Sequence, residues 1–180
     1  MEHAAAPTAA RKAEVLKARA KLLAREPIED RPGQYIEVLE FMLAYERYAI
    51  DSAFVREVHP LKDITTLPGT PGFVAGIVNV RGRIVSVVNL KRFFNLPDKG
   101  LTDFNKVIIL DDGQMEFGLL VDAVLAVQRL AFDSIQPAPS TLNGPRVNKG
   151  ADYLRGVTAE RMSILDAAKI LADPTIVCST

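Results

Sequence analysis

The sequence predicts a mainly β protein in which two small five-stranded barrels lie side by side. Three observations lead to this fold class. Short runs rich in Val, Ile, Leu, Phe and Tyr, bounded by turn residues, occupy much of residues 35–165. Related runs recur in the same order in the second half of the chain. Strands this short, joined by tight turns, favour closed barrels over an open sheet, because closure removes unpaired edges.

Residues 1–30 predict a separate element, a basic amphipathic helix outside the barrels. Six lysines and arginines stand against three glutamates before Pro27, which ends the pattern. A narrow apolar stripe at helical spacing is formed by Val15, Leu16, Leu22 and Leu23. Such a helix either packs its stripe on the barrels or binds a partner or a membrane surface. The sequence leaves these alternatives open.

The first barrel is expected within residues 35–97. Its strands are predicted at residues 35–45, 47–58, 76–80 and 83–90. Residues 67–73 are expected to form a loop, since two prolines and two glycines prevent a strand ladder there. A short helix over residues 90–94 follows the last strand.

The second barrel is expected within residues 104–172. Its strands are predicted at residues 106–110, 116–121, 123–130, 153–158 and 161–165. A second proline-rich loop occupies residues 136–145, and a closing helix covers residues 167–171. The folded domain then extends over residues 31–173. Residues 174–180 form a C-terminal tail, because Pro174 stops the helix.

The two halves use one plan twice in the sequence. The segment that begins at Gly76 corresponds to the one that begins at Gly156, and each runs into a short helix. Asp51 and Asp122 follow corresponding strands. We expect each aspartate to cap a turn by accepting hydrogen bonds from local N–H groups.

The hairpin over residues 76–90 carries the most informative residue, Arg81. Its strands meet at a turn that ends in Gly82, which can adopt positive φ, so one guanidinium points outward from rigid elements. Glu57 is expected to face away from the core and to pair with Arg81. The second half has Ala159 and Glu160 at the corresponding turn, so the repeated scaffold does not require this arginine. The residues alone leave two roles open for Arg81, a structural ion pair and a recognition point for a protein partner, and the asymmetry between the halves favours the second.

Composition restricts the function further. Lysine plus arginine and aspartate plus glutamate number 22 each, so bulk charge favours neither nucleic acid nor a membrane. The single cysteine, Cys178, cannot form an intrachain disulfide, and no Cys/His cluster is available for zinc. No run reaches the roughly 20 apolar residues of a membrane span, and the N-terminus lacks a signal-peptide core. We expect a soluble cytoplasmic protein.

The sequence offers no catalytic constellation. His3 and His59 are the only histidines, and neither has a carboxylate or serine at motif spacing. Asp111, Asp112 and Glu116 suit a hairpin turn better than a calcium loop. No Gly-rich loop precedes a helix in the manner of a phosphate site. We therefore expect no enzyme activity, cofactor or metal, and instead a groove between the barrels that binds a helix or another barrel.

Five segments form a characteristic series: Val55-Arg-Glu57-Val58, residues 71–90 with Asn79-Val-Arg81-Gly82, and residues 117–122, 135–139 and 153–166. With these segments, residues 35–171 resemble the CheW domain, the coupling protein of bacterial chemotaxis arrays. Their order and spacing hold across the whole domain, which makes the resemblance specific.

The resemblance implies two SH3-like barrels that bridge a methyl-accepting chemoreceptor's cytoplasmic tip and the regulatory domain of the histidine kinase CheA. The implied receptor-binding groove contains Val55, Glu57, Val58, Asn79, Arg81, Gly82 and Val121. Kinase and ring contacts would include Ser140 and Thr141, where many members have an acidic and an aromatic residue. Asn89 replaces the family's aspartate, which Asp166 keeps in the second half. The protein is then expected to be monomeric alone and assembled in arrays.

Other functional classes stay open. A CheW-like domain that regulates a non-chemotaxis receptor–kinase pathway, or one fused to a signalling enzyme, would carry the same motifs. The chain ends soon after its last predicted helix and has neither a receiver-type phosphoacceptor arrangement nor an ATP-binding motif, which favours a free-standing adaptor. A small-molecule-binding barrel would need a sizeable cavity, whereas small barrels are usually filled by side chains.

Overall fold

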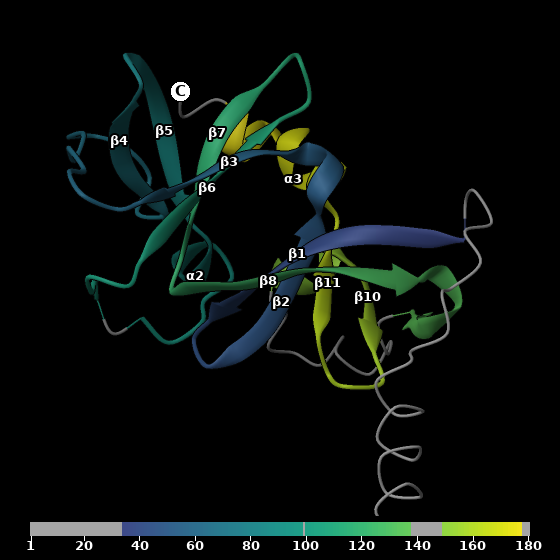
Figure 1. Cartoon of the computed structure of the whole chain (residues 1–180). Helices are drawn as coiled ribbons and strands as arrows, with labels where there is room; N and C mark the ends of the chain where they lie inside the picture. Colours follow the sequence, from purple (N-terminus) through teal and green to yellow (C-terminus); the bar gives the residue numbers. More distant parts are fainter. Residues whose placement is uncertain (1–33, 99, 138–148, 178–180) are drawn as a thin grey trace, which may run out of the picture. The chain divides into compact units, whose positions relative to one another are not determined.

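The computed structural model describes residues 34–98, 100–137 and 149–177. The predicted N-terminal helix, Ser140, Thr141 and Cys178 lie outside the described residues. Two sheets account for the strands of the described chain (Figure 1). The prediction of a mainly β protein with two barrel-like units is therefore confirmed.

The first sheet has six strands in the order β8-β1-β2-β11-β10-β9. We call it the six-stranded sheet. Its strands are β1 (Tyr35–Leu43), β2 (Glu46–Asp51), β8 (Ala123–Ala131), β9 (Ile135–Gln136), β10 (Leu154–Thr158) and β11 (Ser163–Leu165).

The second sheet, the five-stranded sheet, has the order β3-β6-β7-β5-β4. Its strands are β3 (Val55–Pro60), β4 (Val74–Val80), β5 (Arg83–Asn89), β6 (Lys106–Asp111) and β7 (Glu116–Val121). The short helices are η1 (Ser52–Phe54), α2 (Leu90–Phe93), η2 (Phe132–Ser134), η4 (Lys149–Tyr153), α3 (Ala167–Leu171) and α4 (Pro174–Val177).

The predicted division into barrels at residues 35–97 and 104–172 is wrong, because the halves of the chain exchange strands. β1 and β2 pair with β8 and β11 of the second half, whereas β6 and β7 pair with β3 and β5 of the first. The hydrophobic pattern identifies strands but not their partners. The predicted strand at residues 47–58 is also interrupted by η1, where the Asp51 carboxylate accepts a hydrogen bond from the Ala53 N–H at 2.9 Å.

In each sheet, one further backbone segment pairs with an edge strand and passes close to a glycine of that strand. Thr65, beyond β3, exchanges two backbone hydrogen bonds with Ile77 of β4, and β9 pairs with β10 in the other sheet. A Cβ atom added to Gly76 would lie 2.3 Å from the carbonyl oxygen of Thr65. On Gly156 it would lie 2.5 Å from the carbonyl oxygen of Gln136. The correspondence between Gly76 and Gly156 thus reflects one requirement, close passage of the backbone that completes the sheet.

A helix follows the last strand of each half, as predicted, and each begins at a polar N-cap. Asn89 caps α2 by accepting a hydrogen bond from the Lys91 N–H at 3.0 Å, and Asp166 caps α3 by accepting one from the Lys169 N–H at 3.1 Å. Asparagine is as good an N-cap as aspartate, so the substitution at residue 89 keeps this role. The predicted C-terminal tail contains one more short helix, α4, whose Ile176 is buried.

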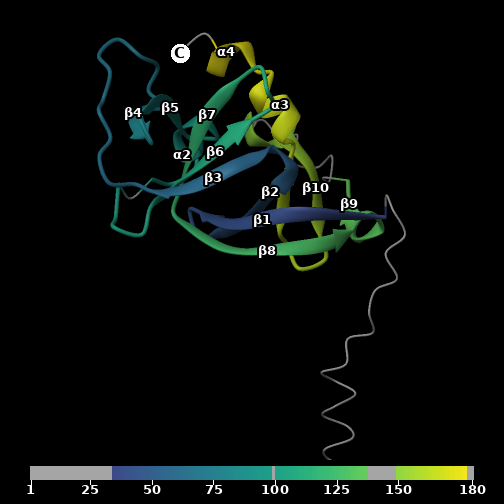
Figure 2. The ribbon, with the colours of Figure 1, turned by 45° about the horizontal axis from the view of Figure 1, so that its top comes forward.

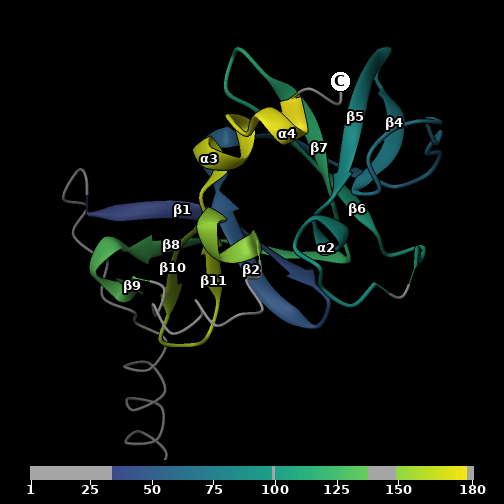
Figure 3. The same ribbon diagram turned by 180° about the vertical axis from the view of Figure 1, so that it is seen from behind.

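The largest core cluster contains side chains of both sheets. Phe41 and Ile50 of the six-stranded sheet are buried with Leu110 and Phe117 of the five-stranded sheet, and with Ile170 of α3. In Figures 2 and 3, α3 and α4 lie beside the β6–β7 hairpin. Separate smaller clusters fill the interior of the five-stranded sheet around Val87 and of the six-stranded sheet around Ile164.

The glycine crossing in the five-stranded sheet gives a stability prediction. Gly76→Ala is expected to lower the free energy of unfolding by about 2–4 kcal/mol, because the new methyl group overlaps the Thr65 carbonyl and the backbone has a φ of 144°. Urea denaturation of the full chain measures the change. Gly72→Ala is the matched control, since a Cβ at Gly72 meets no atom within 4 Å. Equal stability of the two variants would contradict this account of the crossing.

Candidate functional site

The residues implied as a receptor-binding groove all lie on or beside the five-stranded sheet. Val55, Glu57 and Val58 belong to β3, and Asn79 is on β4 next to the turn. Val121, at the end of β7, is completely buried in the main core and has no surface to offer a partner, so its assignment to the groove is wrong. β7 is a central strand buried over most of its length, and its uninterrupted apolar run is typical of such a strand.

Arg81 is displayed by a two-residue hairpin turn between β4 and β5. Both central residues have left-handed backbone, with φ 52° at Arg81 and 85° at Gly82, while Val80 pairs with Arg83. The Asn79 carboxamide oxygen accepts a hydrogen bond from the Gly82 N–H at 2.8 Å. This geometry matches the right-handed twist of the strands, and it leaves the Arg81 side chain 78% exposed.

Glu57 lies at the centre of the charged groups beside this turn. Its Oε2 is 3.4 Å from Arg81 Nε and 3.1 Å from His59 Nε2, and its Oε1 accepts a hydrogen bond from Arg83 Nη2 at 2.9 Å. The predicted pairing of Glu57 with Arg81 is confirmed. The expected outward orientation is wrong, because the Glu57 side chain is only 17% exposed and Val58 is the outward-facing neighbour. Burial alternates regularly along β3, so Glu57 lies with Val55 and His59 on the less exposed side and Val58 lies with Arg56 on the outer side.

The charged network continues across the sheet through Arg83. Arg83 also contacts the carboxylate of Glu116, which lies 3.8 Å from Arg56, and Arg56 bonds Asp111 at 2.6 Å. The hydrogen bond that Arg83 donates to Glu116 is the largest cause that raises the pKa of Arg83 above its ordinary value. Arg81 is therefore the outermost cation of a network whose other guanidinium groups are engaged by carboxylates of strands.

The six-stranded sheet contains the same framework with different charges. The register places β8 on β1 as β3 lies on β6, each with a bulge, so Gln128 corresponds to His59 and Ala126 to Glu57. Arg47 and Glu160 lie 3.5 Å apart at positions that correspond to Glu116 and Arg83, with the charges reversed. The carboxylate that holds Arg81 thus has no counterpart in the six-stranded sheet.

Apolar surface flanks the Arg81 turn. Val58 is 38% exposed and Ile84 64% exposed. A hollow of about 490 Å³ beside them is lined by residues of the five-stranded sheet and its loop, among them His59, Asp63, Asn79 and Ile84. We call Val58, Arg81 and Ile84, with Glu57 and His59 behind them, the Arg81 surface. Val55 packs partly against the main core, so it contributes less to this surface than predicted.

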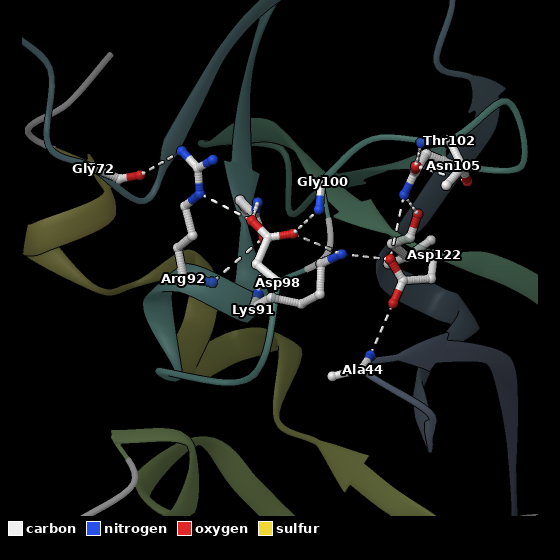
Figure 4. Close-up of polar contacts among 11 residues, drawn as sticks. Ala44, Gly72, Lys91, Arg92, Asp98, Gly100, Thr102, Asn105 and Asp122 are labelled. Atoms are coloured by element: carbon white, nitrogen blue, oxygen red, sulfur yellow. Dashed lines mark hydrogen bonds and ion pairs between the residues drawn. The ribbon is translucent and has the colours of Figure 1, made fainter.

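A buried lysine joins the two sheets on another side (Figure 4). The Lys91 ammonium is 2.6 Å from Asp122 Oδ1 and 3.1 Å from Asp98 Oδ1, and the other oxygen of Asp122 accepts a hydrogen bond from the Ala44 N–H at 2.8 Å. Ala44 belongs to the β1–β2 turn, so the predicted local capping role of Asp122 is wrong. We call Lys91, Asp98, Asn105 and Asp122 the Lys91 cluster, in which the Asn105 amide also bonds the Val121 carbonyl at 3.0 Å.

The ionisation of the Lys91 cluster follows from these contacts. Burial alone would lower the pKa of Lys91, but its hydrogen bonds to Asp122 and Asp98 outweigh burial and raise that pKa. Burial alone would raise the pKa of Asp98, but hydrogen bonds from Lys91, from the Gly100 N–H and from Arg92 lower it to about 2. Both groups are therefore charged at neutral pH.

Comparison with known proteins identifies the family. Residues 37–175 match the model of the CheW-like domain. The chain belongs to the CheW-like family. It is 36% identical to chemotaxis protein CheW of Klebsiella aerogenes over 139 residues, which cover 76% of this chain and 81% of that protein. It is 27% identical to chemotaxis protein CheW of Treponema pallidum, with 82% and 88% covered.

The fold of the CheW-like family is also seen in a solved structure. The scaffolding protein TtCheW of Thermoanaerobacter tengcongensis superimposes with a TM-score of 0.64 at 30% sequence identity. The match covers 78% of this chain and 90% of TtCheW. The resemblance given above for residues 35–171 is thereby confirmed.

No helix among the described residues is both long and apolar enough to cross a membrane. No group of three or more His, Cys, Asp and Glu side chains in the described ranges is arranged to hold a metal ion.

Sequence reasoning missed the contacts of His59, Arg83 and Lys91. His59 and Glu57 are two residues apart on one strand, which places both on the same face, so their contact was available from strand periodicity. Arg83 and Lys91 meet acids 33 and 31 residues away, and no local pattern signals such a pairing.

The Lys91 cluster predicts a large effect of removing one charge. Lys91→Met is expected to lower the free energy of unfolding by about 3 kcal/mol, because Asp98 and Asp122 lose their shared cation in a poorly solvated place. Lys169→Met in α3 removes an exposed lysine from the corresponding helix of the other half and is the control. Thermal or urea unfolding of both variants checks the difference, and similar stabilities would show that the buried cation adds nothing.

Acid unfolding tests the ionisation of Asp98. Its pKa is about 2 in the folded chain and 3.8 ordinarily, so the unfolded state binds the proton first as pH falls. Asp98 therefore contributes about 2 kcal/mol above pH 4, and this contribution is lost between pH 4 and pH 2. Urea midpoints at pH 5 should be lower for Asp98→Asn than for the natural chain, and the two should converge near pH 2. Parallel pH profiles would refute the assignment.

Proposed function

We propose that this chain is a non-enzymatic cytoplasmic adaptor that couples the cytoplasmic tip of a chemoreceptor to the regulatory domain of the histidine kinase CheA. Its membership of the CheW-like family supports this role, since the relatives named above are chemotaxis and scaffolding proteins. One observation supports a receptor contact at this surface: Arg81 is held outward on a rigid turn between exposed Val58 and Ile84.

The chemistry of the Arg81 surface suits a helical partner. A guanidinium with free outer nitrogens binds a carboxylate in two-point geometry, and flanking aliphatic groups bury an apolar side chain. An amphipathic helix that carries an acidic residue one turn from an apolar one presents both groups on one face. We assign Val58, Glu57, Asn79, Arg81 and Gly82 to receptor binding, with Glu57 and Asn79 acting through the position of the turn.

The kinase contact is assigned to the other predicted residues, Ser140 and Thr141, which follow β9 in the sequence. In this proposal the adaptor is monomeric alone and enters an array when both partners are present. A compact unit suits coupling, because a rigid body transmits a small displacement that a flexible linker would absorb.

A second candidate is a scaffold of a receptor–kinase pathway that does not serve chemotaxis. The Myxococcus xanthus protein FrzA is 29% identical over 146 residues and carries a different name from the CheW relatives. Co-purification with the receptor and kinase encoded beside this chain, with and without residues 1–30, distinguishes the two pathways and shows whether the basic segment takes part.

Receptor docking is tested with a matched pair of arginine variants. Arg81→Ala is expected to weaken binding of a recombinant receptor cytoplasmic fragment about tenfold or more, since exposed arginines flanked by apolar groups are frequent binding hot spots. Arg161→Ala is the control, because Arg161 also has a left-handed φ, 60°, in the β10–β11 turn. Calorimetric titration measures both affinities. Equal affinities for the two variants would refute the docking assignment, provided that both unfold at the midpoint of the natural chain.

A further inference from the structure

The Glu57 carboxylate divides its two oxygens between different partners. Oε1 is bonded by Arg83 Nη2 at 2.9 Å, which fixes the carboxylate from the side of β5. Oε2 is approached by both His59 Nε2 at 3.1 Å and Arg81 Nε at 3.4 Å. The longer of these two contacts is made by Arg81, the residue that we propose binds the partner. The Arg81 side chain is 78% exposed.

We propose that His59 and Arg81 compete for Oε2 of Glu57, so that protonation of His59 releases Arg81 to a carboxylate of the partner. This inference rests on the proposed function, and it adds regulation by pH to the same site. A charged imidazole donates a stronger, charge-assisted hydrogen bond to the shared oxygen than a neutral imidazole does. The Arg81–Glu57 contact then weakens, and the guanidinium is free to turn outward.

A positive charge on His59 and the neighbouring charged residues together favour an outward position of the Arg81 guanidinium. A proton on His59 adds a positive charge behind Arg81, which repels the guanidinium toward the partner and attracts an anion. Arg83 stays bonded to Glu57 and Glu116 in both states, so Glu57 keeps its position after Arg81 leaves. Imidazole is the side chain that ordinarily changes charge between pH 5 and 8, and partner binding should therefore strengthen as pH falls through that range.

The other charged residues near His59 are two lysines and one aspartate. Lys62 and Asp63, in the segment after β3, line the same hollow as His59 and carry opposite charges. Val107 of β6 lies opposite His59 and is apolar, and Lys106 pairs with Pro60, the next residue of β3. Asn79 of β4, also at the hollow, is neutral. Glu57 is thus the carboxylate that receives the imidazole.

The corresponding residue of the six-stranded sheet indicates which substitution can replace His59. Gln128 occupies the position on β8 that corresponds to His59, and its amide bonds the buried Glu40 carboxylate at 3.0 Å. Glutamine therefore fits this place in the framework and can donate to a carboxylate without changing charge. His59→Gln is expected to fold normally and to keep the contact with Glu57 at every pH.

Nuclear magnetic resonance of the full chain without a partner gives the first test. The Arg81 Nε–H signal should move between pH 8 and pH 5.5 together with the ring signals of His59, and should stay still in His59→Gln. The same movement of the Arg81 signal in both proteins would overturn the proposal. His3 is the only other histidine, so the ring signals that vanish in the variant belong to His59.

Binding of a recombinant chemoreceptor cytoplasmic fragment gives the second test. Between pH 8 and pH 6 the natural chain should gain about two- to fivefold in affinity relative to His59→Gln, a range set by the strength of a single exposed ion pair. An identical pH dependence in both proteins would overturn the competition. If the fragment binds neither protein at any pH, the proposed receptor function fails, and the resonance of Arg81 still decides whether His59 controls it.

Discussion

The fold depends on an exchange of strands between the two halves of the chain. Neither half contains a complete sheet, since β1 and β2 need strands of the second half and β6 and β7 need strands of the first. The chain passes from one sheet to the other over η1 and again at Asp122, so both sheets form only when distant segments meet. The main core follows from this exchange, because it contains side chains of both sheets. The two sheets therefore cannot separate unless strands unpair. A partner that binds one sheet binds a rigid body that includes the other sheet.

The Lys91 cluster stands at the second crossing and stabilises it. Asp122 is the single residue between β7 and β8, and its two oxygens bond Lys91 of α2 and the N–H of Ala44 in the β1–β2 turn (Figure 4). That turn holds Ala44 and Tyr45 in left-handed backbone, which costs free energy in residues other than glycine. The charge-assisted hydrogen bonds of Asp122 with Lys91 and with the Ala44 N–H offset this cost. The polar contact thus fixes the approach of the two sheets, while the apolar core supplies most of the favourable free energy.

Sequence reasoning reached the strands and the repeat but not the pairing. Alternation and turn residues locate β6, β7 and the β4–β5 hairpin closely, because each is a local pattern. Nothing local distinguishes a strand that pairs within its own half from one that pairs across halves, which is why the division into barrels at residues 35–97 and 104–172 failed. Of the site, the Arg81–Glu57 pair was predicted from charge and position. The burial of Val121 was not predicted, because the sequence pattern does not show which face of the sheet an apolar residue at the end of a strand occupies.

The repeat explains why the Arg81 surface lies on one sheet only. At corresponding positions of the two halves, the residues that the fold requires are similar, whereas the residues of the Arg81 surface differ. Gly76 and Gly156 both admit a crossing backbone, and Asn89 and Asp166 both cap a helix. Glu57, in contrast, corresponds to Ala126. The six-stranded sheet shows that an alanine suffices for this bulged strand, so the half-buried carboxylate of Glu57 is not a requirement of the scaffold. Its contacts with His59, Arg81 and Arg83 instead orient an exposed cation, as the proposed binding of a partner at this surface requires.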